Sequence, residues 1–282
     1  MKRIKSFESG AICYLIATPI GNLSDISSRA LEILSKVEVV ACEDTRNTSL
    51  LLSKFGLHKT LISYHEHNEQ ECSQKLLTML KNGSSIAIVS DAGYPGISDP
   101  GSVIVSHCIN QDIPVSNIPG ANASLPALIA SGLDNKHYYY HGFLPSKPSE
   151  RKKELELLSS IPVTLIFYES PHRILDTLND MLNILGDRKV CLCRELTKLH
   201  EEFIRGTLSE LITLDESTLR GEMVLVVEGA SNVNKSYSEE ELIKLVNEEL
   251  KGGISLKQAC QEVSKMTGEK KNKLYQLMIN QK

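Results

Sequence analysis

The sequence predicts an α/β protein with two α/β domains followed by a small helical unit. From residue 11 onward, short β-rich runs alternate with helical patterns of apolar residues, which is typical of parallel α/β layers. The stretch 235–282 instead contains no β-rich run and holds nine lysines and seven glutamates. A length of 282 residues suits about two domains with cores of their own. The predicted domains are therefore residues 1–118, 119–234 and 235–282.

The first domain is predicted to contain a sheet covered by helices on both faces. Several of its β-rich runs are apolar at every position, as such a sheet requires. The expected strands are residues 11–17, 38–42, 60–64, 85–90 and 113–117. Apolar residues between Leu23 and Val37 recur at spacings of three and four, which predicts an amphipathic helix between the first two strands.

The second domain is predicted from a second set of β-rich runs. These strands are residues 137–143, 163–168, 189–194, 201–205 and 222–228, with a helix marked by Leu175, Leu178, Leu182 and Leu185. The remaining stretch begins a helix at Ser238, where a serine is followed by three glutamates, a capping signal. Gly252, Gly253 and Gly268 then divide this unit into three short helices.

Composition excludes several functional classes. The 31 Lys and Arg against 35 Asp and Glu leave a net charge of -4, so a nucleic-acid partner has to be met locally. No apolar run reaches the ~18 residues of a membrane span, and we expect no membrane partner. The basic N-terminus resembles a signal peptide, but Glu8 and the Pro19 turn do not fit one. Seven cysteines without regular spacing favour reduced thiols in the cytoplasm.

Three loops rich in glycine and proline are the predicted ligand site. No Gly-x-Gly and no Gly-Lys pair occurs, so the dinucleotide fingerprint and the phosphate-binding P-loop are absent. Residues 18–22, 91–101 and 119–123 each follow a predicted strand, where open α/β sheets bind ligands. Asp91 and Asp99 can face a cation or cap a helix; the alternative is a tight connection in which Asp99 is only an N-cap.

These loops and several further motifs carry a family resemblance. The motifs are ATPIGNL at 17–23 with Asp25, Ile26 and Arg29, CEDTR at 42–46, the loop at 91–101, Pro119-Gly120, FLP at 143–145, YESPHR at 168–173, RELTK at 194–198, HEE at 200–202 and GEMV at 221–224. In this order and spacing the chain resembles the ribosomal small-subunit methyltransferase I family, within the tetrapyrrole methylase superfamily.

The resemblance implies two α/β domains of the tetrapyrrole methylase type, with S-adenosylmethionine (SAM) bound in the cleft between them, and a homodimer. It also implies methylation of the ribose 2'-oxygen of a decoding-centre cytidine in 16S rRNA of the small ribosomal subunit. The implied cofactor residues are Pro19, Gly21, Asp91, Gly93, Pro95, Gly96, Ile97, Ser98, Pro119, Gly120, Ala121, Asn122, Ala123, Leu144 and Met223. Asn122 stands where relatives often have serine, and Tyr94 where a threonine is common.

A ribose hydroxyl is a poor nucleophile, so positioning supplies most of the rate and a base adds to it. The candidate bases are Glu43, Asp44, His65, Glu169 and Glu195. We favour Glu43 or Asp44, with Arg46 as their catalytic partner; the alternative is an Asp44–Arg46 ion pair in which Asp44 caps a helix. The candidate RNA contacts are Arg46, His65, Lys147, Arg151, Arg173, Lys198 and the lysines of 235–282.

A metal site and two other functions are the alternatives to this interpretation. His65-Glu66-His67 and the Cys191, Cys193 pair lack the second pair of ligands typical of zinc sites, so no metal is expected. Methyl transfer to a tetrapyrrole is one alternative function. The other is a ribosome-associated binding module whose cleft retains SAM without catalysis.

Overall fold

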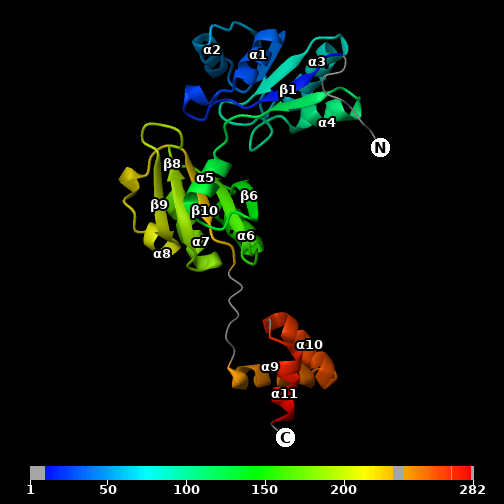
Figure 1. Cartoon of the computed structure of the whole chain (residues 1–282), viewed down its shortest axis with the longest axis vertical. Helices are drawn as coiled ribbons and strands as arrows, with labels where there is room; N and C mark the ends of the chain where they lie inside the picture. The colour runs from blue at the N-terminus through cyan, green and yellow to red at the C-terminus, as the bar shows by residue number, and fades with distance from the viewer. Residues whose placement is uncertain (1–9, 231–237, 268, 281–282) are drawn as a thin grey trace. The chain divides into compact units, whose positions relative to one another are not determined.

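The computed structural model describes residues 10–230, 238–267 and 269–280. The chain forms two compact units, Met1–Gly229 and Ala230–Lys282, and the first unit contains two five-stranded sheets (Figure 1). The first of these sheets ends with β5 at Ile118 and the second begins with β6 at Tyr138. The structure divides the first unit no further, so the domain boundary at residue 118 stays a prediction.

The first sheet is parallel throughout, with the strand order β3-β2-β4-β1-β5. Its strands are β1 Cys13–Ile16, β2 Val39–Cys42, β3 Thr60–Ser63, β4 Ile86–Val89 and β5 Val115–Ile118. Its helices are α1 Ser28–Lys36, α2 Thr45–Lys54, α3 Glu69–Lys81 and α4 Ser102–Asn110. Separate apolar clusters on α1 with α2 and on α3 with α4 cover the two faces, which explains why β2 and β4 are apolar and buried at every position.

The second sheet is mixed, with the strand order β6-β7-β10-β8-β9. Its strands are β6 Tyr138–Phe143, β7 Thr164–Glu169, β8 Lys189–Arg194, β9 Glu202–Thr207 and β10 Met223–Val227. Helix α5 Ser124–Ser131 contacts four of these strands on one face. Helices α6 Pro148–Leu158, α7 Ile174–Leu185 and α8 Leu208–Leu211 pack on the other face. The predicted strands are confirmed, with shifts of a residue or a few at their ends.

Two predictions about the α/β layers need correction. Only β6 and β7 pair in parallel in the second sheet, because β10 inserts antiparallel between β7 and β8; the short connection from β8 to β9 also forces an antiparallel pair. The predicted helix between residues 23 and 37 is interrupted. A 3-10 turn, η1 Leu23–Asp25, comes first, and α1 starts only after Ser27, whose side chain accepts a hydrogen bond from the amide of Ala30.

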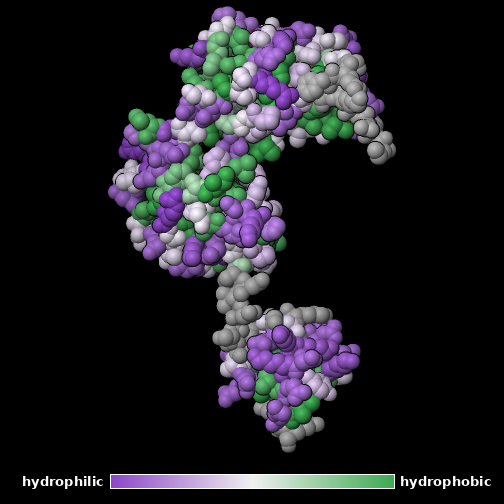
Figure 2. Space-filling model, viewed as in Figure 1, coloured by the Kyte–Doolittle hydropathy of each residue, from purple (hydrophilic) through white to green (hydrophobic). Residues whose placement is uncertain are grey.

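The C-terminal unit consists of three helices around a small core of their own. They are α9 Glu239–Lys251, α10 Leu256–Thr267 and α11 Lys271–Ile279. The predicted start is confirmed, because Ser238 and Glu241 cap the first turn of α9 reciprocally. Gly252 ends α9 as predicted, whereas Gly268 lies outside the described residues. Hydrophilic residues predominate on the face of this unit that Figure 2 shows.

Candidate functional site

A cavity of about 480 Å³, called the main cavity below, joins the loops of the first sheet to the second sheet. Its walls come from the segments after β1, β4 and β5 and from β6, β7 and β10. The lining residues are Ile20, Asp91, Ala92, Gly93, Tyr94, Ile97, Ser98, Asp99, Asn122, Ala123, Ser124, Leu125, Tyr138, Tyr140, Phe143, Tyr168, Glu169, Leu196, Glu222, Met223 and Val224. A cavity of this size suits a ligand of a few hundred daltons.

The main cavity brings together about half of the residues expected to contact the cofactor. Asp91, Gly93, Ile97, Ser98, Asn122, Ala123 and Met223 line it. Pro19 and Gly21 line a second cavity, and Gly96 lines a third one beside Ser98. Pro95, Pro119, Gly120, Ala121 and Leu144 line none of these three cavities. Leu144 is 2% exposed and packs in the core of the second sheet.

The aromatic wall of the main cavity was missed by the sequence analysis. Tyr138, Tyr140 and Phe143 come from β6, and Tyr168 comes from β7. Tyr138 and Tyr140 share a face because side chains alternate along a strand. A register shift between Tyr140 and Gly142 then lets Phe143 line the same cavity. Three consecutive tyrosines, residues 138–140, on a predicted strand were the available signal. The sequence alone did not show which face of that strand meets the loops of the first sheet.

The loop after β4 is held by hydrogen bonds to strand β6 and to the loop after β5. Ser98 has a φ of 61°, and its hydroxyl lies 2.8 Å from that of Tyr140. A positive φ at a residue other than glycine is costly, so the surrounding contacts have to maintain it. The amide of Gly120 donates to the hydroxyl of Tyr94 at 2.9 Å. Tyr94 therefore ties two of the three glycine- and proline-rich loops together.

Asn122 precedes the N-cap residue Ala123 of α5 and binds the first turn of this helix. Its Oδ1 accepts from the amide of Leu125 at 2.9 Å and from the hydroxyl of Ser124 at 3.1 Å. A serine hydroxyl in this position could also accept a hydrogen bond from the first turn of α5.

Asp44 and Arg46 form the ion pair that was the alternative to a catalytic role. Their side chains lie 2.7 Å apart, and the Arg46 side chain is 87% exposed. Asp44 also accepts from the Arg46 amide as the N-cap of α2. The side-chain and backbone hydrogen bonds from Arg46 lower the pKa of Asp44 to about 2, which makes this carboxylate a weak base.

Three further carboxyl groups influence one another at the ends of β2 and β4. Burial, followed by the charges of Glu43 and Asp91, raises the pKa of Asp99 to about 6. Burial and Asp91 also raise the pKa of Glu43, which His65 opposes. Asp99 and Asp91 line the main cavity, and Glu43 does not. Asp99 is thus a cavity carboxyl that titrates near neutrality.

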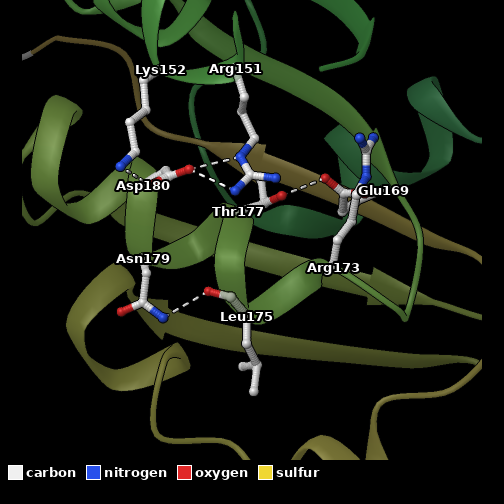
Figure 3. Close-up of polar contacts among 8 residues, drawn as sticks. All are labelled: Arg151, Lys152, Glu169, Arg173, Leu175, Thr177, Asn179 and Asp180. Carbon is white, nitrogen blue, oxygen red and sulfur yellow. Dashed lines mark hydrogen bonds and ion pairs between the residues drawn. The ribbon is translucent and has the colours of Figure 1, made fainter. Parts of the chain in front are cut away.

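Glu169 lines the main cavity and forms a polar cluster with Arg173 and Thr177 (Figure 3). The Glu169 side chain is 1% exposed and accepts from the Ser170 amide, from Nε of Arg173 at 2.5 Å and from the hydroxyl of Thr177 at 2.7 Å. Three donors leave this carboxylate poorly suited to act as a base. The two Nη groups of Arg173 have no hydrogen-bond partner within the described ranges.

The remaining predicted RNA contacts differ in exposure. Arg151 is 3% exposed and binds Asp180 at 2.7 Å, as Figure 3 shows; its expected place on the surface is therefore corrected, because the pair fills the space between α6 and α7. Lys147 is exposed and pairs with Glu150. Burial opposes charge on Lys198, but hydrogen bonds from its ammonium to Glu222 and Glu195 outweigh this effect and raise its pKa.

His65, which was also predicted to contact RNA, is half-buried. Its Nδ1 is buried without a partner among the described residues, and its ring lies 5.9 Å from that of His67.

Across the described residues, no three His, Cys, Asp or Glu side chains are grouped as a metal site requires. No described helix is both long and apolar enough to cross a membrane.

The two sheets, the strand-end loops and the cavity between them define an α/β methylase of the tetrapyrrole methylase class with two sheets in one compact unit. A model of the family "Tetrapyrrole (Corrin/Porphyrin) Methylases" matches residues 13–212, and one described as "RsmI C-terminal HTH domain" matches residues 238–282. The chain belongs to the ribosomal RNA small subunit methyltransferase I family. SAM is the methyl donor of this family, as the resemblance implied.

Relatives of that name match almost the whole chain. The protein from Halalkalibacterium halodurans is 46% identical over 94% of this chain and 93% of its own. The protein from Haemophilus influenzae is 46% identical over 94% of this chain and 95% of its own.

Solved structures share the fold at lower identity. The methyltransferase CobJ is 18% identical, with a TM-score of 0.60 over 79% of this chain and 95% of its own. Uroporphyrin-III C-methyl transferase from Thermus thermophilus, solved with S-adenyl homocysteine, is 17% identical, with a TM-score of 0.54 over 79% and 100%.

Proposed function

We propose that this protein methylates the ribose 2'-oxygen of a cytidine in 16S rRNA, with SAM as the methyl donor. The observation that carries the proposal is the main cavity, in which three loops of the family motifs meet an aromatic wall. Near full-length relatives named ribosomal RNA small subunit methyltransferase I support the RNA substrate. The tetrapyrrole alternative is supported by the description of the matched family model and by the fold of distant structures, whereas the near full-length relatives carry the RNA methyltransferase name.

The main cavity fits SAM by its size and by the chemistry of its walls. The flat rings of Tyr140, Tyr168 and Phe143 cluster with centroids 5.3 to 5.6 Å apart and supply a surface for an adenine ring. Asp91 and Asp99 offer negative charge to a sulfonium. Gly93, with a φ of 75°, exposes backbone that a side chain would cover. SAM supplies an electrophilic methyl group when bound.

We propose Asp99 as the acceptor of the ribose hydroxyl proton. A general base works best when its pKa lies near the working pH, and Asp99 has a pKa of about 6 inside the main cavity. Glu43, predicted from the sequence, remains a second candidate because its pKa is also raised. Asp44 is the weakest of the three because Arg46 stabilises its ionised form.

Arg46, Arg173, His65, Lys147 and Lys198 are the proposed RNA contacts that remain. Arg46 is the most exposed of the paired arginines of the site, and Arg173 has unpartnered Nη groups in the described structure. The helical unit carries a small excess of lysine over glutamate and is a further candidate for phosphate contacts. We also propose that the protein works as a homodimer in the cytoplasm on the small ribosomal subunit.

The proposal is tested by methyl transfer from isotopically labelled SAM to small subunits that lack this modification. Nuclease digestion and mass spectrometry then locate the label. Label on the ribose of one cytidine supports the proposal. Bound SAM without label in the RNA contradicts it; label on a tetrapyrrole then identifies the first alternative, and RNA binding without transfer identifies the binding module.

A further inference from the structure

Tyr138 is an aromatic side chain of the main cavity to which the proposed function gives no task. It is the first residue of β6, it is 45% exposed, and it lines the cavity. Leu125, in the first turn of α5, is also exposed and lines the same cavity. Neither residue is among those expected to contact the cofactor. We call this pair the outer wall, because both side chains face solvent as well as the cavity.

The ring of Tyr138 is available to a ligand. The rings of Tyr140 and Phe143 each contact the ring of Tyr168, whereas the Tyr138 side chain has neither a ring contact nor a hydrogen-bond partner within the described ranges. Ile97 and Phe143 line the same cavity and are exposed as well. Large apolar side chains that gather in this way at the solvent side of a cavity mark a binding surface, and covering an aromatic ring contributes strongly to binding.

The alternation of side chains along β6 separates Tyr138 from its neighbour Tyr139. Tyr138 shares a face with Tyr140, which pairs in register with Ile166 of the apolar cluster beneath α5. Tyr139 pairs with Leu165, which packs in the cluster on the other face of the sheet. Tyr139 is 41% exposed and lines none of the three cavities. The strand thus carries two tyrosines of similar exposure, one inside the site and one outside it.

An RNA base suits the outer wall. Every base has a flat face that stacks on aromatic side chains, and this contact is common in RNA recognition. Tyr138 and Tyr140 are separated by ~7 Å along the strand. The hydroxyl of Tyr140 lies 2.8 Å from that of Ser98, and Ser98 directly precedes Asp99, the proposed acceptor of the ribose proton. A base on Tyr138 can therefore direct its ribose toward Asp99.

We propose that Tyr138 stacks on the base of the target nucleotide and thereby holds the ribose of that nucleotide in the main cavity. This inference rests on the proposed function and names a residue that positions its RNA substrate. The rings of Tyr140, Tyr168 and Phe143 stay available to the adenine of SAM, so cofactor and target base use different parts of one cavity. The target base has to leave the RNA helix first, because a base inside the helix has neither face free.

Tyr138→Ala and Tyr139→Ala test this contact as a matched pair. Loss of a stacked ring weakens binding about tenfold or more, so Tyr138→Ala should raise the KM for small subunits by this factor and leave the Kd for SAM unchanged. Tyr139→Ala should change neither constant. Equal KM values for the two variants overturn the inference. A weaker Kd for SAM in Tyr138→Ala also overturns it, because Tyr138 then binds the cofactor.

Tyr138→Phe separates the ring from its hydroxyl. It keeps the stacking face and should recover most of the affinity for small subunits that Tyr138→Ala loses. A phenylalanine variant as weak as the alanine variant contradicts stacking and assigns the effect to the hydroxyl. Tyr138→Leu, which lacks a flat face, replaces Tyr138→Ala if thermal unfolding shows that the alanine variant is not folded.

A photochemical crosslink locates the target base directly. Small subunits are reconstituted with 5-iodocytidine at the target position and irradiated in complex with the protein, so that the iodinated base forms a bond to an aromatic ring stacked on it. Peptide mass spectrometry should place the crosslink at Tyr138 in the wild type and in Tyr139→Ala, and should find none there in Tyr138→Ala. A crosslink only at other residues, or no crosslink, overturns the inference. If the wild-type protein methylates no small subunit, the proposed function fails instead.

Discussion

Nε of Arg173 donates to Oε1 of Glu169 at 2.5 Å, and this bond fixes the direction of an arginine whose partner carboxylate lines the main cavity. The Glu169 side chain is 1% exposed, whereas that of Arg173 is 19% exposed. The carboxylate is thus enclosed, while the guanidinium keeps a free edge. The two Nη groups of Arg173 can therefore donate to two oxygens of one phosphate group. Because Glu169 already fixes the side chain, little side-chain entropy is lost when the phosphate binds.

Arg173→Ala should therefore weaken RNA binding and leave SAM binding intact, and it should also lower stability because it removes one of three donors to the buried Glu169 carboxylate. We expect the KM for small subunits to rise about tenfold and the dependence of log KM on log salt concentration to flatten by about one phosphate contact. Steady-state kinetics at several salt concentrations and calorimetric SAM binding measure both effects. A variant that loses SAM affinity instead would place Arg173 with the cofactor.

Arg151→Ala should lower stability as its main effect. Arg151 and Asp180 form a second buried ion pair, with side chains 4% and 10% exposed, and removing the arginine leaves a buried carboxylate. The expected loss in the free energy of unfolding is about 3 kcal/mol, moderated by Lys152, which lies 3.5 Å from Asp180. Urea denaturation measures it. The exposed pair of Lys147 and Glu150 provides the control, because Lys147→Ala should change stability by at most about 0.5 kcal/mol.

These two arginines also show how far the sequence could predict the site. Arg151 and Arg173 both stand in motif-rich, charged stretches, and sequence alone assigned both to RNA. The burial of Arg151 depends on α6 and α7 packing together, a tertiary contact that local patterns do not encode, whereas Arg173 meets Glu169 at the end of β7. Strands β2, β4 and β10 were predictable because they are apolar at every position and buried. The start of α9 was predictable because Ser238 and Glu241 interact locally.

The pairing direction in the second sheet and the shape of the cavities were not predictable in this way. β10 inserts between two strands that precede it in the chain, and no local signal marks such an insertion. The loops that line the main cavity were identified from glycine and proline alone. The aromatic residues facing them belong to another sheet, so their role appears only when the two sheets come together.

Gly21→Ala should disturb the contact between the loop after β1 and the loop after β8. Gly21 has a φ of 146°, and an added Cβ would lie 2.5 Å from Cγ of Lys198. We expect a loss of about 2 kcal/mol from strain and displacement of Lys198. Gly132→Ala is the matched control, because it has a φ of 80° and no atom within 4 Å of the added Cβ. Equal losses of unfolding free energy in both variants would show that the Lys198 contact contributes nothing.

Asp99→Asn should increase stability at neutral pH and reduce methyl transfer. Burial, then Glu43 and Asp91, raise the pKa of Asp99 to about 6, whereas an unfolded aspartate titrates near ~4. The folded state therefore binds more protons between these values, so this contribution to stability is complete below about pH 4 and is lost as the pH rises through about 6.

A neutral asparagine avoids that loss, so the variant should gain about 1 kcal/mol at about pH 8, after allowance for solvent screening, and almost nothing at about pH 4. Urea denaturation at both pH values measures the gain, with the exposed Asp25→Asn as control. If Asp99 accepts the proton, wild-type methyl transfer rises with pH around 6 and the variant loses about a hundredfold or more. If Asp99→Asn is stabilised but fully active, the raised pKa of Asp99 is supported and its role as proton acceptor is contradicted. Glu43 then becomes the proposed proton acceptor, since its pKa is also raised.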